Sequence, residues 1–251
     1  MDADTRSGQG LDAALVRFGH STFRAGQREA IEALLSLGRL LLVAPTGGGK
    51  SLCYQLPACI LPGTTLVVSP LIALMQDQVD ALPRVGIDAT YLASTLDAGE
   101  ARRRFAGIAR GDYSLVFVAP ERLALPGFRS LAMDLDCPLL AVDEAHCISE
   151  WGHDFRPEYL NLGEVVAALP KARLLACTAT ATPVVRDEIL ARLGLPADTP
   201  QLVHGFARPE LSLRAREVSG ARERRSLVDA ALAEALAAPG QGRGAAIVYS
   251  P

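Results

Sequence analysis

Cysteine is scarce in this 251-residue chain, and its spacing argues against two common structural roles. The five cysteines stand at positions 53, 59, 137, 147 and 177, and no two of them have the CxxC spacing of a zinc site or redox motif. Their odd number argues against a disulfide framework as well. We therefore expect free thiols, most of them buried as small apolar side chains, and no zinc in this segment.

Long apolar runs are also missing. No stretch approaches the roughly 18 consecutive apolar residues of a membrane-spanning helix, so we expect no membrane association. The first ten residues, MDADTRSGQG, are polar and acidic, unlike a secretory signal. The sequence thus predicts an intracellular protein, located in the nucleoid-associated cytoplasm if the source is bacterial.

The chain has no excess of basic charge, and its formal net charge is −3. Domains that bind nucleic acid are usually basic, so this total is mild evidence against such a role. A local basic groove remains open, because the distribution of charge matters more than its sum.

What the sequence does contain is a repeated alternation of short apolar runs with segments of helical spacing. Runs that are apolar at nearly every position are typical of strands buried on both faces in a parallel sheet. The sequence therefore predicts an α/β fold with a mostly parallel buried sheet flanked by helices. The six runs are RLLLVAP, TTLVVSP, ATYLAS, YSLVFVAP, PLLAVDEAH and ARLLACTAT.

Polar signatures follow several of these runs directly: PTGGGKS, SP, APER, DEAH and TAT. In open parallel sheets, ligands bind outside the carboxyl ends of the strands. We therefore expect these signatures to meet at one edge of the sheet and to form the binding site.

The pattern suggests three segments along the chain. Residues 1–10 are predicted to be disordered, and residues 11–205 to form the α/β domain. In residues 206–251, PELSLRAREV alternates like a half-exposed strand, RSLVDAALAEALA is helical, and AAIVYSP begins like another buried strand. Three such elements cannot bury a core alone, so we interpret residues 206–251 as the beginning of a second domain that is cut short.

The stretch VAPTGGGKS has the layout of a Walker A phosphate loop. The glycines allow backbone N–H groups to turn toward an anion, and the following helix adds the positive end of its dipole. The strict pattern begins with glycine, but Ala44 stands there, which leaves an ordinary glycine-rich turn as the alternative. The residues expected to hold the nucleotide here are Thr46, Gly47, Gly48, Gly49, Lys50 (on the β- and γ-phosphates) and Ser51 (on Mg²⁺).

A second acidic signature, DEAH, follows the apolar run LLAV. Asp143 is placed to hold Mg²⁺ with Ser51, and Glu144 to polarise an attacking water. His146 is better placed to link the acidic pair to a neighbouring strand end. DEAH alone could be an exposed acidic turn, but together with the phosphate loop it predicts ATP hydrolysis at Lys50, Asp143, Glu144 and His146.

Together these stretches resemble superfamily 2 helicases, and within them the RecQ family of DNA helicases, from about Leu15 to Pro251. The alanine at position 44 is expected in this superfamily. VVSPLIALMQDQV resembles motif Ia, which in the family lies along DNA. FGHSTFRAGQ resembles the segment that reads adenine: Gln27 matches the glutamine on the base edge, Arg24 an arginine of the same pocket, and His20 a stacking position.

The stretch DEAHCISEWGHDFRPEY resembles the RecQ aromatic-rich loop. It implies DNA binding by Trp151, His153, Phe155 and Arg156, with Trp151 as a stacking platform for an unpaired base. The alternative is that Trp151 and Phe155 only anchor the loop to the core.

LLACTATATPVVRDEI resembles motif III. Thr178 and Thr180 are then coupling residues that hydrogen-bond near His146. They could also simply cap the next helix.

The resemblance implies that residues 11–205 are a RecA-like P-loop NTPase domain and that residues 206–251 begin a second RecA-like domain. It implies an ATP- and Mg²⁺-dependent DNA helicase of 3′ to 5′ polarity, acting on single-stranded and partly duplex DNA in repair and recombination. The arginine finger and the accessory domains of the family are not in these residues, so we do not expect the segment to unwind duplexes alone. An RNA helicase, an ATP-gated binding module without productive unwinding, and a small-molecule P-loop kinase are the alternatives.

Overall fold

The computed structural model describes residues 3–151, 154–205, 212, 214–237 and 244–249, with only the backbone described at 3–9 and 126. The chain divides into two compact units, Met1–Phe206 and Ala207–Pro251. Among the described residues, no helix is both long and apolar enough to cross a membrane.

The first unit is built on a seven-stranded sheet within the described residues, and every strand pair is parallel. The spatial order is β3-β4-β2-β5-β6-β1-β7. The six predicted runs all form strands. β7 was not predicted, because it is only three residues long and partly exposed. The strands are β1 (Arg39–Val43), β2 (Thr65–Val68), β3 (Ala89–Leu92), β4 (Leu115–Val118), β5 (Leu139–Val142), β6 (Arg173–Thr178) and β7 (Gln201–Val203).

Side chains that alternate along the strands divide the core into two layers. On β1, Leu41 and Val43 join one apolar cluster, whereas Leu40 and Leu42 join the other. Both layers are buried, which explains why the strands are apolar at successive positions.

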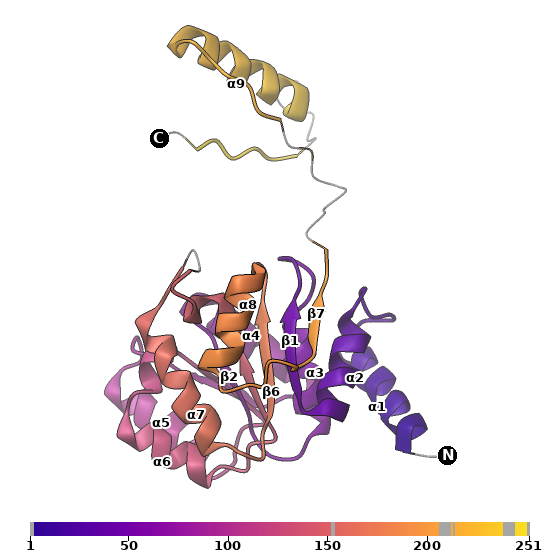
Figure 1. The fold of residues 1–251 in the computed structure, drawn as a ribbon, viewed down its shortest axis with the longest axis vertical. Coiled ribbons are helices and arrows are strands. Elements are labelled where there is room, and N and C mark those ends of the chain that lie inside the picture. The colour runs from indigo at the N-terminus through magenta and orange to yellow at the C-terminus, as the bar shows by residue number, and fades with distance from the viewer. Residues whose placement is uncertain (1–2, 152–153, 206–211, 213, 238–243, 250–251) are drawn as a thin grey trace. The chain divides into compact units, whose positions relative to one another are not determined.

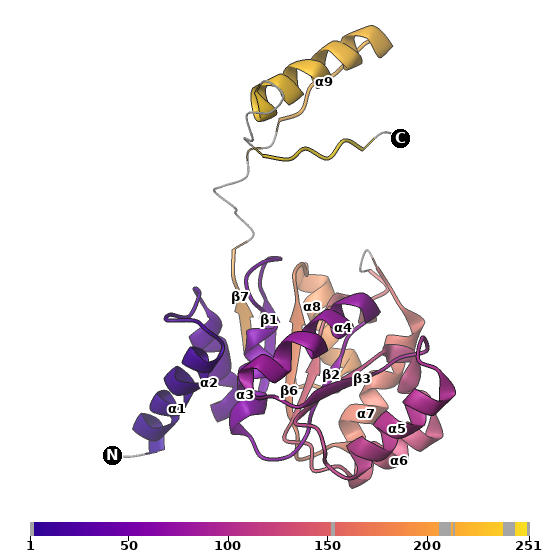
Figure 2. The same ribbon diagram turned by 180° about the vertical axis from the view of Figure 1, so that it is seen from behind.

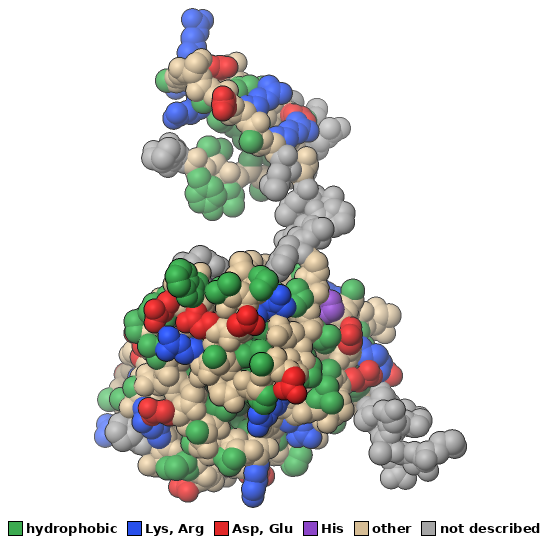
Figure 3. Space-filling view, viewed as in Figure 1, with side chains coloured by type: hydrophobic (Ala, Val, Ile, Leu, Met, Phe, Trp, Pro, Cys, Tyr) green, Lys and Arg blue, Asp and Glu red, His purple; other side chains and the backbone are tan. Residues whose placement is uncertain are grey.

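Helices cover both faces of the sheet (Figure 1 shows α7 and α8 over one face, and Figure 2 shows α3 and α4 over the other). One layer holds α1 (Ala3–Arg17), α2 (Gln27–Leu37), α3 (Leu52–Ile60) and α4 (Ile72–Ala81). The opposite layer holds α5 (Ala98–Ala109), α6 (Pro126–Asp134), α7 (Leu162–Ala168) and α8 (Pro183–Arg192). On the face that carries α7 and α8, acidic and basic side chains are interspersed (Figure 3).

The N-terminal segment differs from the prediction of disorder over residues 1–10. Helix α1 begins at Ala3 and continues to Arg17. It is held by Leu11 and Leu15, which are buried against the α2–α3 layer, and helix formation propagates from such an anchored turn toward the N-terminus.

The second unit contains α9 (Ala221–Leu236). The expected strands are not seen in its described residues: 214–218 and 244–249 have no strand pairing. Ile247 is 79% exposed and Tyr249 is 88% exposed, so residues 245–249 are not buried here, whereas AAIVYSP was predicted to begin a buried strand. A strand requires a neighbouring strand for its N–H and C=O groups, and the described part of this unit offers none.

Candidate nucleotide and nucleic-acid site

The glycine loop joins β1 to α3, at the carboxyl end of the sheet. Gly47 and Gly49 have φ values of 80° and 75°, in the left-handed region. A side chain there costs roughly 1–2 kcal/mol. A Cβ at Gly48 would come within 2.9 Å of the Pro45 carbonyl oxygen. The loop conformation therefore requires the glycines that the sequence supplies.

Lys50 and Ser51 follow the loop at the start of α3. The Lys50 ammonium donates to the Ala44 carbonyl oxygen at 3.1 Å, so the side chain folds back over its own loop. Ser51 is the N-cap residue of α3, and its hydroxyl makes no capping bond. Thr46 is exposed at the tip of the loop.

The predicted adenine-reading segment contacts this loop directly. The Gln27 side-chain amide donates to the Gly49 carbonyl oxygen at 3.0 Å and accepts from the Arg24 backbone N–H at 2.8 Å. The Arg24 guanidinium donates to the Gly47 carbonyl oxygen. The structure thus brings Arg24 and Gln27 to the phosphate loop, whereas His20 is exposed and has no side-chain hydrogen bond among the described residues.

The acidic signature lies on the neighbouring side of the same edge. β6 separates β1 from β5, with Val43 beside Thr178, so the ends of the three strands lie together. Asp143 is buried, and its Oδ1 accepts from the Glu144 N–H at 3.0 Å and from the Cys177 thiol at 3.4 Å.

Burial, and next the charge of Glu144, raise the pKa of the Asp143 carboxyl above its usual value. The positive charge of Lys50 acts in the opposite direction on that pKa. Lys50 and Asp143 therefore share one electrostatic neighbourhood, as a site for a phosphate–cation pair requires.

Glu144 and His146 occupy the tight turn after β5. Glu144 has a φ of 47°, which is uncommon for a residue with a side chain, and its Oε2 lies 3.3 Å from His146 Nδ1. The same Nδ1 lies 2.8 Å from the Thr178 hydroxyl on β6.

The residue that caps α8 is Thr182, and neither Thr178 nor Thr180 is its N-cap. The Thr182 hydroxyl accepts from the Val185 N–H. The Thr180 backbone N–H and carbonyl oxygen both bond to the Thr178 hydroxyl, and the Thr180 side chain is exposed.

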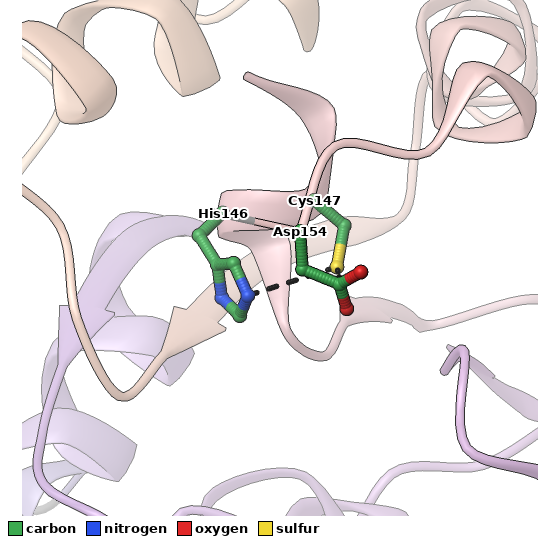
Figure 4. Close-up of side chains that lie close together, drawn as sticks. All are labelled: His146, Cys147 and Asp154. Carbon is green, nitrogen blue, oxygen red and sulfur yellow. Dashed lines mark hydrogen bonds between the residues drawn. The ribbon is translucent and has the colours of Figure 1, made fainter. Parts of the chain in front are cut away.

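His146, Cys147 and Asp154 also lie close together (Figure 4). The Cys147 sulfur is 3.8 Å from His146 Nε2 and 3.7 Å from Asp154 Oδ2, and the three possible ligand atoms lie within 4.8 Å of one another. Burial raises the pKa of the Cys147 thiol to about 12. The protonated thiol is a hydrogen-bond donor to Asp154, which explains the contact without a metal ion.

The loop after DEAH presents its tryptophan to solvent. Trp151 is 78% exposed, so it does not anchor the loop to the core. Arg156 donates to the Pro70 carbonyl oxygen, in the motif Ia-like segment, at 3.4 Å, and its backbone N–H bonds to Cys147. Phe155 is half-buried, and His153 lies outside the described residues.

Three further residues at the site were not predicted, because the residues they contact are remote in sequence. Buried Tyr159 donates to the Asp143 carbonyl oxygen at 3.0 Å, and Cys177 donates to its carboxylate. His204, just after β7, packs so closely on Gly26 that a Cβ there would lie 2.1 Å from its Nε2. His204 also lines a cavity of about 10 Å³ with Lys50 and other loop residues.

The fold and this set of residues define a class of protein. A model of the DEAD/DEAH box helicases matches residues 24–188, and the chain belongs to this family. Solved helicase structures share its fold. A hypothetical ATP-dependent RNA helicase from Sulfolobus tokodaii has a TM-score of 0.60 at 16% identity, covering 77% of this chain and 57% of that one. The Mycobacterium smegmatis helicase Lhr, bound to single-stranded DNA and AMP-PNP, has a TM-score of 0.59 at 19% identity. The match covers 77% of this chain and 27% of that one.

Within that family the chain is a homologue of the RecQ DNA helicases. It is 46% identical over 199 residues to the ATP-dependent DNA helicase RecQ of Bacillus subtilis, which is 78% of this chain and 34% of the relative. It is 40% identical over 235 residues to the probable ATP-dependent DNA helicase RecS of the same organism. This match covers 93% of this chain and 45% of the relative. The chain thus spans from about a third to under half of the length of these curated relatives.

Proposed function

We propose that this chain is the ATP-binding RecA-like domain of an ATP-dependent DNA helicase. The observation that carries the proposal is the convergence of the glycine loop, Lys50 and buried Asp143 at one sheet edge, with an exposed Trp151 on the loop that leaves the same turn. Membership in the helicase family supports ATP as the nucleotide.

The loop residues fit a triphosphate. Gly47, Gly48 and Gly49 form a backbone cradle that a side chain would fill, and Lys50 supplies a positive charge that would exchange its bond to Ala44 for the β- and γ-phosphates. The Ser51 hydroxyl makes no capping bond, and it would exchange its side-chain contact with Tyr54 for Mg²⁺.

The acids fit a divalent cation and a hydrolytic water. A carboxylate whose charge is penalised by burial and by a neighbouring acid gains most from a cation, and Asp143 is such a group. Mg²⁺ would supply charge neutralisation at the phosphates when bound. Glu144 would orient water, with His146 holding its carboxylate.

Adenine recognition is assigned to Gln27 and Arg24, with His20 as the proposed stacking residue. The Gln27 amide already bonds to the Gly49 carbonyl oxygen and to the Arg24 backbone N–H, so reading the base edge requires exchange of at least one of these bonds. Base recognition would then alter the phosphate loop through the Gly49 contact.

DNA binding is assigned to Trp151, Phe155, Arg156 and His153, with Thr178 and Thr180 as coupling residues. RecQ relatives are DNA helicases, which favours single-stranded and partly duplex DNA over RNA. Polarity of 3′ to 5′ and a role in repair and recombination follow from the RecQ resemblance. An ATP-gated binding module is the second candidate, favoured by the absence of strand pairing in the described residues of the second unit.

The test is ATP hydrolysis with and without single-stranded DNA, comparing this chain with one extended through a complete second RecA-like domain. We expect DNA-stimulated turnover and unwinding only in the extended chain. Robust strand separation by the 251 residues alone would contradict the expectation that unwinding needs the second domain. Absence of ATP turnover in both chains would favour the binding module.

A further inference from the structure

The root of the Trp151 loop is fixed to α8 by four polar side chains, Ser149, Glu150, Glu188 and Arg192, which we call the α8 network. The Ser149 hydroxyl donates to Glu188 Oε2 at 2.5 Å. The Arg192 guanidinium lies 3.2 Å from Glu150 Oε1 and 3.5 Å from Glu188 Oε1. Two loop residues are thereby joined to two residues one turn apart on the helix.

The four side chains of the α8 network differ in how far they are exposed to solvent. Ser149 is fully buried and the Glu188 side chain is 17% exposed, whereas Arg192 is 41% and Glu150 is 60% exposed. A charge-assisted bond in the low-dielectric interior is stronger than a solvated ion pair. The Ser149–Glu188 bond is therefore the principal contact, and the Arg192 pairs are secondary.

The same hydroxyl also holds the tryptophan. The Trp151 backbone N–H donates to Ser149 Oγ at 3.2 Å, so one serine joins the platform residue to α8. Glu188 fixes the position of Ser149, and through it the position at which Trp151 leaves the core.

The opposite end of α8 leads to the nucleotide site. Its N-cap is Thr182, four residues after Thr178, whose hydroxyl contacts His146. The side of α8 also packs against the 3₁₀ turn Ala145–Ile148, which contains His146. A helix that bonds to the loop at one end and packs against the turn that contains His146 is an element on which two sites can act.

We propose that Glu188 is a positioning residue that couples the Trp151 loop to the His146–Thr178 pair through α8. The inference rests on the proposed function of the loop as a DNA platform. If it holds, nucleotide and DNA affinities are linked, and by reciprocity each ligand changes the affinity of the other by the same factor.

The experiment uses the whole chain and needs no turnover. Trp151 is the only tryptophan, so its fluorescence reports binding of a short oligodeoxythymidine. We would measure the DNA dissociation constant with and without a non-hydrolysable ATP analogue and Mg²⁺. For the unchanged chain we expect the two constants to differ by about fivefold or more.

Glu188→Gln keeps the side-chain shape but removes the charge, and we expect it to bring that ratio close to one while nucleotide affinity without DNA stays unchanged. Arg192→Ala, at an exposed position, should reduce the ratio less. Asp187→Asn is the matched control, because it removes the same charge from an exposed neighbouring position of α8 and should leave the ratio intact.

The outcomes distinguish this inference from the proposed function. If the unchanged chain binds neither DNA nor the analogue, the proposed function fails. If both bind and Glu188→Gln leaves the ratio as it was, or weakens both ligands equally, the coupling role is overturned. Hydrogen exchange of the Trp151 amide tests the anchoring independently: it should become faster in Glu188→Gln and not in Asp187→Asn, and equal rates would contradict the anchoring.

Discussion

His146 and Thr178 join the end of β5 to the end of β6, with 2.8 Å between His146 Nδ1 and the Thr178 hydroxyl oxygen. That hydroxyl donates its single hydrogen to the Thr180 carbonyl oxygen at 3.2 Å. Glu144 Oε2 lies 3.3 Å from the same Nδ1. One imidazole nitrogen of His146 thus links the acidic turn to the next strand.

Replacing Thr178 by valine preserves volume but removes this hydroxyl. We expect the free energy of unfolding to fall by about 1 kcal/mol, the typical net contribution of a hydrogen bond, because the buried His146 Nδ1 loses its contact with the hydroxyl. Urea unfolding measures the change. Thr180→Val is the control, since its side chain is exposed and should leave stability within about 0.5 kcal/mol. Equal losses in both variants would contradict a stabilising role for the Thr178 hydroxyl.

Asp143→Asn is expected to stabilise the protein at neutral pH while removing Mg²⁺-dependent nucleotide binding. The folded-state pKa of Asp143 lies above its unfolded value because of burial and the Glu144 charge, so the cost of ionising it appears as pH rises through the folded pKa. At pH values below the unfolded pKa both forms are neutral at this position, and the advantage of asparagine should vanish.

The check for Asp143 is urea unfolding across a pH series in the presence of a chelator. The gap in unfolding free energy between Asp143→Asn and the unchanged chain should grow with rising pH. A gap that is independent of pH, or that favours the unchanged chain near neutrality, would be inconsistent with the raised pKa.

Comparing Gly49→Ala with Gly47→Ala distinguishes backbone strain from a steric clash with Gln27. Both positions have left-handed backbone, so each variant should lose roughly 1–2 kcal/mol of stability. Only at Gly49 would the new Cβ meet Gln27, at 2.3 Å from its amide nitrogen. We therefore expect a larger loss in Gly49→Ala, measured by thermal unfolding of the ligand-free chain; a larger loss in Gly47→Ala would refute the contact.

Trp151→Ala should weaken binding of single-stranded DNA by about 5- to 150-fold, corresponding to roughly 1–3 kcal/mol of base stacking. Trp151→Phe should retain much of the affinity because it keeps an aromatic face. Fluorescence anisotropy of a labelled oligonucleotide measures both. Neither variant should lower thermal stability noticeably, since the side chain is 78% exposed. Unchanged affinity in Trp151→Ala would remove the stacking role.

Much of the sheet was predictable because its strands are buried on both faces and therefore apolar at successive positions. The stretch QLV of β7 is only three residues long and partly exposed, so it carries no such signal. Residues 245–249 show the opposite case: they have the composition of a strand, but a strand also needs a partner, and none pairs with them in the described part of the chain.

The site was predictable where the chemistry is local in sequence, as in Gly47–Ser51 and Asp143–His146. Contacts between distant segments were not, because a single sequence does not tell which side chains meet. The Gln27 bond to Gly49, the Tyr159 bond to Asp143 and the Ser149 bond to Glu188 are of this kind. They depend on strand order, which places segments far apart in the chain at one edge of the sheet.

Calorimetric titration of ATP into this chain, with Mg²⁺ or with a chelator, tests the central claim most directly. The account predicts saturable, Mg²⁺-dependent binding that weakens about 10- to 100-fold in Lys50→Ala, the loss expected for charge-assisted hydrogen bonds to phosphate. Asp143→Asn should abolish the Mg²⁺ dependence. Binding that is insensitive to Mg²⁺ and to both substitutions would show that Lys50 and Asp143 do not share a nucleotide site.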